Sequence, residues 1–400
     1  MISVDEALAR VLSAITPLPA ETVALSAASG RTTASPITAR LFNPAFDVSA
    51  MDGYAVRAAD VAPGATLEMI GMAQAGSGFS GTIGPGQCTR IFTGAPVPQG
   101  ADAVVIQEHT HADGAAIHFE QTVAPRLNIR FRGADFALGD ALVPVGARLT
   151  PARLALVAAG NVDTLSVATL PRVALLATGD ELVLPGSTVG PDQIVASIST
   201  GLSAFLAPYA STVTDLGIVP DDREVLGAAL AAALDAAPDI LVTTGGASVG
   251  EHDYVQDMLR ANGVDIDFWR IAMRPGRPLM VGRRGRTLVF GLPGNPVSAL
   301  VTARLFVVPA LLALVGSAPP PSFFLPLAAP LPPNGPRRHF RRGRLISDPK
   351  RGTLVEPILQ TDSGHLSSLA DAEVLIEQRE DCLGIPALNF AQVHTFYPKC

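Results

Sequence analysis

Three glycine-containing turns lie between residues 241 and 298, and each follows a run of apolar, often β-branched residues. They are Gly245-Gly246, Arg274-Pro-Gly-Arg277 and Pro293-Gly-Asn-Pro296. Turns of this kind expose backbone N–H groups, and glycine allows an oxyanion to approach them closely. The stretch therefore predicts a binding site for a phosphate-like anion.

The second and third turns carry further groups that suit an anion. Prolines restrict the loop that contains Arg274 and Arg277, and restrained guanidinium groups make bidentate contacts with oxyanions. A solvated basic surface is the alternative, because other arginines follow closely in the sequence. Asn295 and Pro296 are predicted to begin a helix, with Asn295 as its cap, and a helix start offers free N–H groups to an anion. Ser298 adds a hydroxyl.

Three carboxylates follow two of the predicted strands. Asp180 and Glu181 come directly after one strand, and Asp221 follows another. They could share a divalent cation, since magnesium is commonly held by few carboxylates while substrate phosphates complete its shell. Acidic residues also suit the first turn of a helix, so the residue types leave both interpretations open.

Composition excludes several other classes of function. A net charge of −7 does not favour a nucleic-acid partner. The isolated cysteines Cys88, Cys382 and Cys400 indicate a reducing compartment and support neither a zinc site nor a disulfide framework. No Ser-His-Asp or Cys-His arrangement stands out, and no GxGxxG motif with a ribose-binding acid is present.

Strands and helices alternate from residue 172 onward, which predicts a mostly parallel sheet. In such sheets ligands bind beyond the carboxyl ends of the strands, where the turns described above lie. The predicted strands are 173–177, 212–219, 240–244, 266–272 and 288–290, with helices at 200–206 and 224–236.

The rest of the chain predicts two β-rich parts around this α/β domain. The fold class is α/β multidomain: a central three-layer α/β domain, a β-rich inserted subdomain and a C-terminal β-barrel-like domain. Within the inserted subdomain, 103–107 and 116–120 resemble a hairpin. The expected divisions are residues 1–170 (helical linker parts 1–40 and 136–170, β-rich subdomain 41–135), 171–316 (α/β domain) and 317–400 (C-terminal β domain, opened by a proline-rich linker).

One apolar run, 297–315, approaches the length needed to span a membrane. Arg304 and Pro309 interrupt it, which favours a buried helix of the α/β domain. The acidic N-terminal residues show no signal-peptide pattern, and Ser3 with Glu6 suggests a capping box instead. We therefore expect a cytoplasmic protein without membrane contact.

Seven motifs in order resemble the molybdopterin molybdenumtransferase family of bacterial MoeA type, which is similar to the gephyrin E domain. Any one motif is weak alone, but together they span nearly the whole chain, and 335–345 and 363–369 resemble the family's C-terminal domain more loosely. The motifs are Phe46–Val56, Ile91–Pro98, Arg132–Asp135, Thr178–Leu182, Thr244–Gly250 with Asp253, Arg274–Pro278 and Gly291–Ser298.

The resemblance implies a reaction and its participants. Adenylated molybdopterin and molybdate would give molybdenum cofactor and AMP, with Mg²⁺ as cofactor. The resemblance further implies a homodimer, supplied with its intermediate by a molybdopterin-adenylylating protein, with the active site between the α/β domain of one chain and the β-rich subdomain of its partner.

The resemblance also implies roles for individual residues. The catalytic residues would be Asp52, Thr93, Asp135, Glu181 and Asp253. Pterin and phosphate would be bound by Gly245, Gly246, Ser248, Pro293, Gly294, Asn295 and Pro296. Molybdate or phosphate would be bound by Arg274, Arg277 and Ser298, with Arg342 and Ser368 as a second oxyanion contact, and the metal by Asp180, Glu181 and Asp221.

Six positions depart from the family pattern. Arg274 and Arg277 replace lysines, which keeps the charge but changes its geometry. Four polar residues, two of them acids, are replaced by Val48, Ala134, Ala196 and Ile198. The leading hypothesis is an active molybdenum-insertion enzyme, and the alternative is a weakened paralogue that binds pterin or acts as a scaffold.

Overall fold

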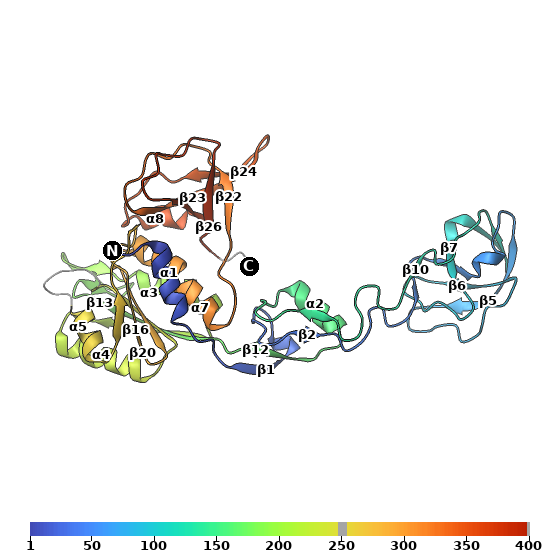
Figure 1. The fold of residues 1–400 in the computed structure, drawn as a ribbon, viewed down its shortest axis with the longest axis horizontal. Coiled ribbons are helices and arrows are strands. Elements are labelled where there is room, and N and C mark those ends of the chain that lie inside the picture. The colour runs from blue at the N-terminus through green and yellow to red at the C-terminus, as the bar shows by residue number, and fades with distance from the viewer. Residues whose placement is uncertain (247–253, 398–400) are drawn as a thin grey trace. The chain divides into compact units, whose positions relative to one another are not determined.

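The computed structural model describes residues 1–246 and 254–397 of the chain. The chain divides into two compact units, Met1–Glu21 with Ala168–Cys400, and Thr22–Val167 (Figure 1). The first unit contains a mixed α/β domain, the N-terminal helix and a C-terminal β domain. The second unit is rich in short strands.

A six-stranded sheet forms the centre of the α/β domain. Its first four strands are parallel, as the sequence predicts, whereas the fifth strand, Met280–Arg284, runs antiparallel to both of its neighbours. The predicted strand 266–272 ends earlier than expected, and β20 was not predicted from the sequence. In spatial order the strands are β16 (Thr212–Val219), β13 (Arg172–Thr178), β17 (Ile240–Thr244), β21 (Thr287–Leu292), β20 (Met280–Arg284) and β18 (Asp265–Phe268).

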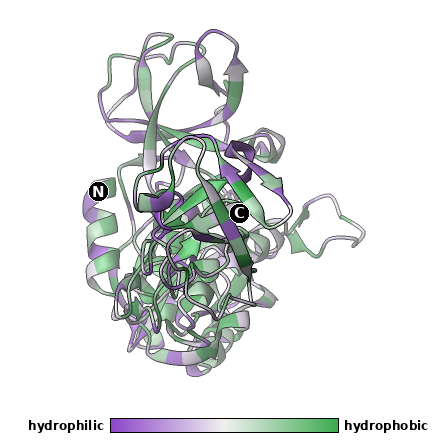
Figure 2. Ribbon diagram, turned by 90° about the vertical axis from the view of Figure 1, so that its right-hand side faces the viewer, coloured by the Kyte–Doolittle hydropathy of each residue, from purple (hydrophilic) through white to green (hydrophobic). Residues whose placement is uncertain are grey.

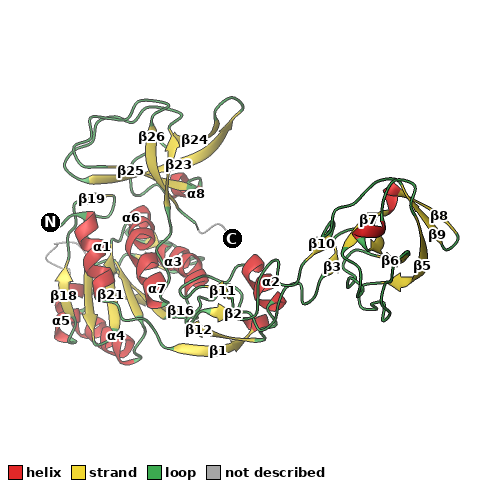
Figure 3. Ribbon diagram, turned by 45° about the vertical axis from the view of Figure 1, so that its right-hand side comes forward, coloured by secondary structure: helices red, strands yellow, loops and turns green. Residues whose placement is uncertain are grey.

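Alternating side chains of these strands pack into two separate cores, one on each face of the sheet. Leu175 and Phe290 belong to the core shared with α1, α3, α6 and α7, whereas Leu176 and Val289 belong to the core shared with α4 and α5 (Figure 3). Three layers, as predicted, therefore enclose the sheet. The helices are α1 (Val4–Ser13), α3 (Ile198–Leu206), α4 (Arg223–Asp235), α5 (Val255–Ala261), α6 (Pro296–Thr302) and α7 (Val308–Leu314).

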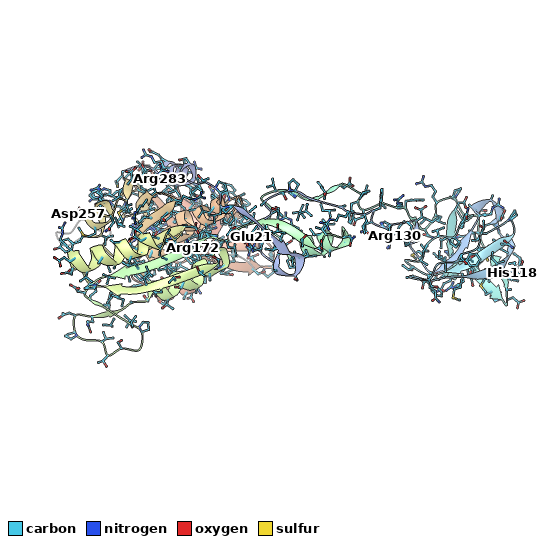
Figure 4. The ribbon with its side chains drawn as sticks, turned by 90° about the horizontal axis from the view of Figure 1, so that it is seen from below. Glu21, His118, Arg130, Arg172, Asp257 and Arg283 are labelled. Carbon is cyan, nitrogen blue, oxygen red and sulfur yellow. The ribbon has the colours of Figure 1, made fainter. Side chains whose placement is uncertain are left out.

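Polar side chains cap the starts of two helices, α1 and α4. Ser3 caps α1 by accepting a hydrogen bond from the Glu6 amide at 3.1 Å, and Asp222 caps α4 through the amides of Glu224 and Val225. At the start of β13, the Arg172 guanidinium donates to the Ala237 carbonyl just beyond α4 (Figure 4). These contacts fix where strands and helices begin and end.

The long apolar helix is a core helix of the α/β domain, as predicted. It runs from Pro296 to Leu314 through a π-helical turn at Ala303–Val307, and 89% of its most apolar window is buried. Arg304 inside it is buried and donates from Nε to the Thr395 carbonyl at 2.7 Å. The strands and helices of this part are predominantly hydrophobic, drawn green in Figure 2.

The C-terminal β domain incorporates a strand from the arginine loop. β19 pairs in parallel with β23, with Arg274 opposite His339. Residues that the sequence assigns to the α/β domain therefore form one edge of this second sheet. Its strands are β19 (Met273–Arg274), β23 (Arg338–Asp348), β25 (Val374–Gln378), β26 (Phe390–Thr395) and β22 (Ser322–Pro326), with β24 (Gly352–Pro357) on β23, and its helix is α8 (Leu366–Ala370).

The second unit contains a six-stranded, mainly antiparallel sheet. The predicted hairpin is wrong in its partners, because β7 pairs with β4 while β8 and β9 form the hairpin. In order the strands are β7 (Ala103–Ile106), β4 (Gly53–Val56), β6 (Gln87–Ile91), β5 (Thr66–Ala73), β9 (Ala116–Phe119) and β8 (Thr110–Asp113).

Shorter elements complete the chain. Two-stranded sheets are β10 (Ile129–Arg130) with β3 (Val48–Ser49), β11 (Ala141–Val143) with β2 (Ile37–Thr38), β1 (Ala20–Ala24) with β12 (Thr164–Ala168), and β14 (Leu182–Val183) with β15 (Ile194–Val195). The one further α-helix among the described residues is α2 (Pro151–Ala159), as predicted.

An ion cluster around the buried Arg338 ties the N-terminal helix to the C-terminal β domain. Arg338 is 7% exposed and donates to both Asp5 oxygens at 2.6 and 2.8 Å. Glu377 and Glu380 lie 3.3 and 3.2 Å from the same guanidinium. The hydrogen bonding to Arg338, helped by the charges of Arg338 and Arg379, holds the pKa of Asp5 below its usual range.

Replacing Arg338 by glutamine is expected to lower the free energy of unfolding by about 2 kcal/mol, because it removes the charge-assisted hydrogen bonds to Asp5 and one of the two partners of the buried Glu377 carboxylate. Urea denaturation at pH 7 measures this change. Arg344→Gln is the control, because Arg344 makes only a surface pair with Glu356 at 3.9 Å. Equal stability of the two variants would show that the cluster does not anchor α1.

Candidate active site

The glycine turn after β17 lies against the turn after β13 at the carboxyl end of the sheet. Gly245 and Gly246 have φ angles of +88° and +57°. A Cβ on Gly245 would lie 2.3 Å from the Thr178 carbonyl oxygen, and one on Gly294 would lie 3.4 Å from the Gly245 Cα. The ends of β13, β17 and β21 thus meet backbone to backbone, and glycine is required at the centre.

A cavity of 260 Å³ opens beside this junction. The α/β domain supplies most of its wall, including the turns after β13, β17 and β21, and Gly364 comes from the C-terminal β domain. Other lining residues are Ala177, Thr178, Glu181, Leu182, Ile194, Val195, Ala196, Ser197, Ile198, Ser199, Thr244, Gly245, Gly294 and Pro296.

Two buried polar atoms belong to the turns at this junction, and one of them, on Thr178, belongs to a residue that lines the cavity. Thr178 Oγ1 and Asn295 Oδ1 are buried and have no hydrogen-bond partner among the described residues. Pro296 is the first residue of α6, as predicted, and Asn295 occupies the cap position. Its side chain makes no capping hydrogen bond, however, so that prediction is wrong in its contact. A buried polar atom without a partner is costly, which favours a ligand donor at this position.

The predicted metal carboxylates are partly brought together. Asp180 Oδ1 accepts a hydrogen bond from the Asp221 amide at 3.0 Å. The Glu181 carboxylate folds back over Gly179, with Oε2 2.5 Å from the position of a Cβ on that glycine. Within the described residues no group of three His, Cys, Asp or Glu side chains is arranged to hold a metal ion. The metal assignment stays a prediction.

The arginine loop packs on helix α6 and on the C-terminal sheet. A Cβ on Gly276, which has a φ of +96°, would lie 2.3 Å from Thr302 Cγ2 on α6. The Ile271 amide closes the loop by donating to the Arg277 carbonyl at 3.1 Å. Arg274 and Arg277 are both exposed, so their guanidinium groups are accessible to an anion.

The sequence analysis missed two residues of the C-terminal sheet that accompany this loop. His339 lies opposite Arg274 in register, is 3% exposed, and has a buried Nδ1 without a partner among the described residues. Arg341 donates from Nε to Gln378 at 2.9 Å, and burial followed by repulsion from Arg274 lowers its pKa. The pairing of β19 with β23 brings these cations together, and no local sequence signal predicts that pairing.

Burial, reinforced by nearby arginines, lowers the pKa of His339 to about 3. In the unfolded chain the pKa is about 6.5, so acid protonates the unfolded state first and stability falls as the pH drops below 6.5. The loss should reach about 3 kcal/mol between pH 7 and pH 4, at about 1.4 kcal/mol per unit of pKa. Denaturation curves for the parent and His339→Gln should diverge only in this window, and parallel curves would contradict the assignment.

Arg342 and Ser368 contact each other, and the terminal nitrogens of Arg342 make further hydrogen bonds within the C-terminal β domain. Arg342 is 5% exposed and donates to Ser368 Oγ at 2.7 Å. It also donates to the carbonyls of Gln360, Asp362 and His365. Their role as a second oxyanion contact stays a prediction, and these hydrogen bonds favour a structural role.

Four further residues were predicted to belong to the site, and the structure describes two of them. Ser298 lies on α6 and is only 5% exposed, whereas Pro293 is buried in the turn after β21. Ser248 and Asp253 lie outside the described residues.

In the second unit, two of the predicted catalytic residues are in direct contact. Asp52 Oδ1 accepts hydrogen bonds from the Thr93 amide and from Thr93 Oγ1, at 2.7 and 2.8 Å. These bonds, with the backbone bond as the largest cause, hold the pKa of the exposed Asp52 below its usual range. Asp135 is also exposed and accepts from Asn43 Nδ2 at 3.0 Å. The sequence analysis did not single out Asn43.

The fold and the site together define an α/β protein with a ligand cavity at the carboxyl end of its sheet, and three family descriptions match the chain in order. "MoeA N-terminal region (domain I and II)" matches residues 2–160, "Probable molybdopterin binding domain" matches 174–313 and "MoeA C-terminal region (domain IV)" matches 325–387. The chain belongs to the molybdopterin molybdenumtransferase (MoeA) family, as its motifs predict.

Individual relatives cover nearly the whole chain. The molybdopterin molybdenumtransferase of Haemophilus influenzae is 36% identical over 86% of both chains. Molybdopterin molybdenumtransferase 2 of Mycobacterium tuberculosis is 37% identical over 93% of this chain and 94% of its own. A crystal structure of a molybdopterin biosynthesis MoeA protein from Pyrococcus horikoshii is 30% identical, covers 100% of both chains and has a TM-score of 0.81.

Family membership over the full length makes this chain a transferase of molybdenum-cofactor biosynthesis that inserts molybdenum into molybdopterin. The activity predicted from the sequence is confirmed at this level.

Proposed function

We propose that the chain transfers molybdenum from molybdate to adenylated molybdopterin, releasing molybdenum cofactor and AMP. The observation that carries the proposal is the junction of the turns after β13, β17 and β21 at the carboxyl end of the sheet. Beside it lies a cavity whose lining residue Thr178 has a buried hydroxyl without a partner among the described residues. Fixed backbone dipoles and cations aimed at a pyrophosphate stabilise the charge that develops when it is cleaved.

Pterin and phosphate groups would contact the turns that surround the cavity. Gly245 and Gly246 offer a close approach to backbone, and Pro293, Gly294, Asn295 and Pro296 form the turn that leads into α6 beside them. The proposal also includes Ser248 and Asp253, which lie outside the described residues.

Molybdate would bind at the arginine loop. Arg274 and Arg277 are exposed on a loop that is closed by its own backbone and packed on α6. Two restrained guanidinium groups suit a tetrahedral dianion. Ser298 adds a hydroxyl from α6, although its burial restricts it to the edge of such a site.

We propose Mg²⁺ as the cofactor, bound by Asp180, Glu181 and Asp221. These residues suit magnesium in type, because the ion takes as few as one or two carboxylates and completes its shell with water and phosphate oxygens. When bound it would neutralise the pyrophosphate. Omitting Mg²⁺ from the reaction should abolish turnover while leaving molybdate binding unchanged.

The remaining catalytic residues lie in the other compact unit. One subunit would contribute Asp52, Thr93 and Asp135. They would act on the substrate bound at the α/β domain of a partner subunit, which supplies Glu181, so the enzyme would be a homodimer. A molybdopterin-adenylylating protein would supply the substrate. A cytoplasmic location is supported by the free cysteines Cys88 and Cys382. We propose no nucleic-acid or membrane partner.

A second candidate function is pterin binding or scaffolding without turnover. The cavity itself favours it, because Ala196 and Ile198 line the wall where polar residues are usual in the family. Val48 is buried in β3 and Ala134 is exposed in the second unit. A scaffold would bind molybdopterin yet release no AMP, whereas an enzyme would lose AMP release in the Asp52→Ala and Asp253→Ala variants.

A crystal soaked with AMP and molybdate tests the assignment of the site. Both ligands should lie against the turns that carry Ser248, Arg274 and Ser298, with the oxyanion on the arginine side. Ligands bound elsewhere, or a cavity that stays empty at saturating AMP, would contradict it.

A further inference from the structure

Arg90 lies on β6 of the second unit, close to the contact between Asp52 and Thr93. In the antiparallel pairing of β6 with β4, Arg90 is opposite Tyr54. Asp52 directly precedes β4, and Thr93 follows shortly after the end of β6. The pairing of these two strands therefore brings Asp52 and Thr93 to the same end of the sheet, beside Arg90.

Arg90 is linked to the backbone of the Asp52 turn by two routes. One terminal nitrogen of its guanidinium donates to the carbonyl of Gly53, the residue after Asp52, at 3.2 Å. The other donates to the side-chain oxygen of Gln107, and the Gln107 amide in turn donates to the Asp52 carbonyl at 3.2 Å. Two successive carbonyls are therefore tied to this guanidinium, one directly and one through Gln107.

Aromatic side chains extend these contacts toward Thr93. The central carbon of the Arg90 guanidinium lies 5.1 Å from the ring centroid of Tyr54 and 5.0 Å from that of Phe92. Both distances are typical of cation–π contacts. Phe92 directly precedes Thr93 in the sequence. Arg90 thus contacts a chain neighbour of each member of the Asp52–Thr93 pair.

The position of Asp52 depends on such contacts, because it lies just outside the packed part of the sheet. Gly53 is buried, and a Cβ there would lie 1.9 Å from the Val105 carbonyl oxygen on β7. Close backbone packing therefore fixes the chain from Gly53 onward. Asp52 precedes this point and is exposed, so hydrogen bonds rather than packing set its direction.

We propose that Arg90 is a positioning residue that holds the Asp52 carboxylate against Thr93 in the geometry required for turnover. An arginine suits this role because its planar fork donates to two acceptors in fixed directions while it stacks on aromatic rings, a combination that lysine does not provide. The inference rests on the proposed function, in which Asp52 and Thr93 are catalytic. Arg90 would affect the reaction only through that pair.

Three variants of the full-length chain separate geometry from charge. Arg90→Gln removes both the charge and the fork, whereas Arg90→Lys keeps the charge without the fork. Gln107→Leu removes one acceptor and leaves Arg90 in place. Gln107 is exposed, so this variant should fold even if changes at the half-buried Arg90 impair folding. Arg57→Gln is the control, because the Arg57 side chain in the same unit pairs with Asp60, at 3.8 Å.

Hydrogen exchange of the ligand-free protein is the first measurement. The amides of Thr93 and Gln107, which donate to Asp52, should exchange at least about 10-fold faster in both Arg90 variants. The Thr93 amide should exchange about 3-fold faster in Gln107→Leu and at the parent's rate in Arg57→Gln.

The parent's rates in Arg90→Lys would show that charge alone suffices and would overturn the proposal. The parent's rates in Arg90→Gln would do the same, as would the parent's Thr93 rate in Gln107→Leu if the Arg90 variants do not fold. This readout needs no substrate, so it decides the role of Arg90 even if the chain shows no turnover and the proposed function fails.

Steady-state kinetics are the second measurement. Arg90→Gln and Arg90→Lys should each lower kcat about 10- to 100-fold and leave KM for both substrates within about twofold, because a misplaced catalytic group affects the transition state more than binding. In an Asp52→Ala background, Arg90→Gln should cause no further loss, since residues that act as one unit are not additive. A further loss of about 10-fold there, or a raised KM with normal kcat in the single variants, would mean that Arg90 contacts substrate directly and would overturn the proposal.

Discussion

Replacing Asp52 by alanine is expected to lower turnover about 100- to 1000-fold without loss of folding. The carboxylate is held by two hydrogen bonds from Thr93 and keeps its negative charge at lower pH than an ordinary aspartate. Removing one preorganised electrostatic contact of this kind from an active site lowers kcat by about 100- to 1000-fold. AMP release under saturating substrate measures the loss, and circular dichroism confirms that the variant is folded.

Two further variants test whether the loss is specific to Asp52 and whether it depends on the hydrogen bonds from Thr93. Asp163→Ala is the control, because Asp163 is also an exposed aspartate with a lowered pKa, owing to Arg40, but lies outside the proposed site. It should keep the parent's turnover. Thr93→Val should raise the pKa of Asp52 toward its usual value and move the acidic limb of the rate profile to higher pH. Full activity in Asp52→Ala would remove this residue from the catalytic assignment.

Replacing Gly245 by alanine is expected to abolish detectable ligand binding at the sheet end. The new Cβ would lie 2.3 Å from the Thr178 carbonyl oxygen and 3.0 Å from Thr178 Oγ1, so the turn must move away from β13. The left-handed φ of +88° adds backbone strain of about 1 kcal/mol or more. Isothermal titration calorimetry of the protein with AMP measures the effect on binding.

Gly263→Ala provides a matched control for that strain. Gly263 has a φ of +79° in the same domain, but a Cβ there would meet nothing within 4 Å. This variant should lose a similar amount of stability through backbone strain while binding AMP normally. If Gly245→Ala also bound AMP normally, the three-turn junction would not be the ligand site.

The fold was largely predictable from the sequence because its signals are local. Alternating strands and helices predict the parallel part of the sheet, and Pro296 marks the start of α6. The antiparallel edge was harder to predict. β18 ends at Phe268, and the predicted continuation of this strand does not pair within the α/β sheet. Met273–Arg274 instead pair with β23, more than 60 residues later in the sequence. Such pairing depends on tertiary contacts.

The candidate site was predictable where backbone geometry requires a particular residue. Gly245 has a positive φ and a close backbone neighbour, so glycine marks the position in the sequence itself. Arg342 shows the limit of such reasoning, because an arginine that binds an oxyanion and one that holds a loop look alike in sequence. The hydrogen bonds from Arg342 to the carbonyls of Gln360, Asp362 and His365 come from tertiary contacts that no local sequence signal predicts.

The most direct test of the central claim is a reaction of the purified full-length chain with adenylated molybdopterin, molybdate and Mg²⁺. Molybdenum cofactor and AMP are quantified together over time. We predict that they form in equal amounts and that AMP release depends on molybdate. A folded protein that binds the adenylated substrate but forms neither product would contradict the account and favour the scaffolding alternative.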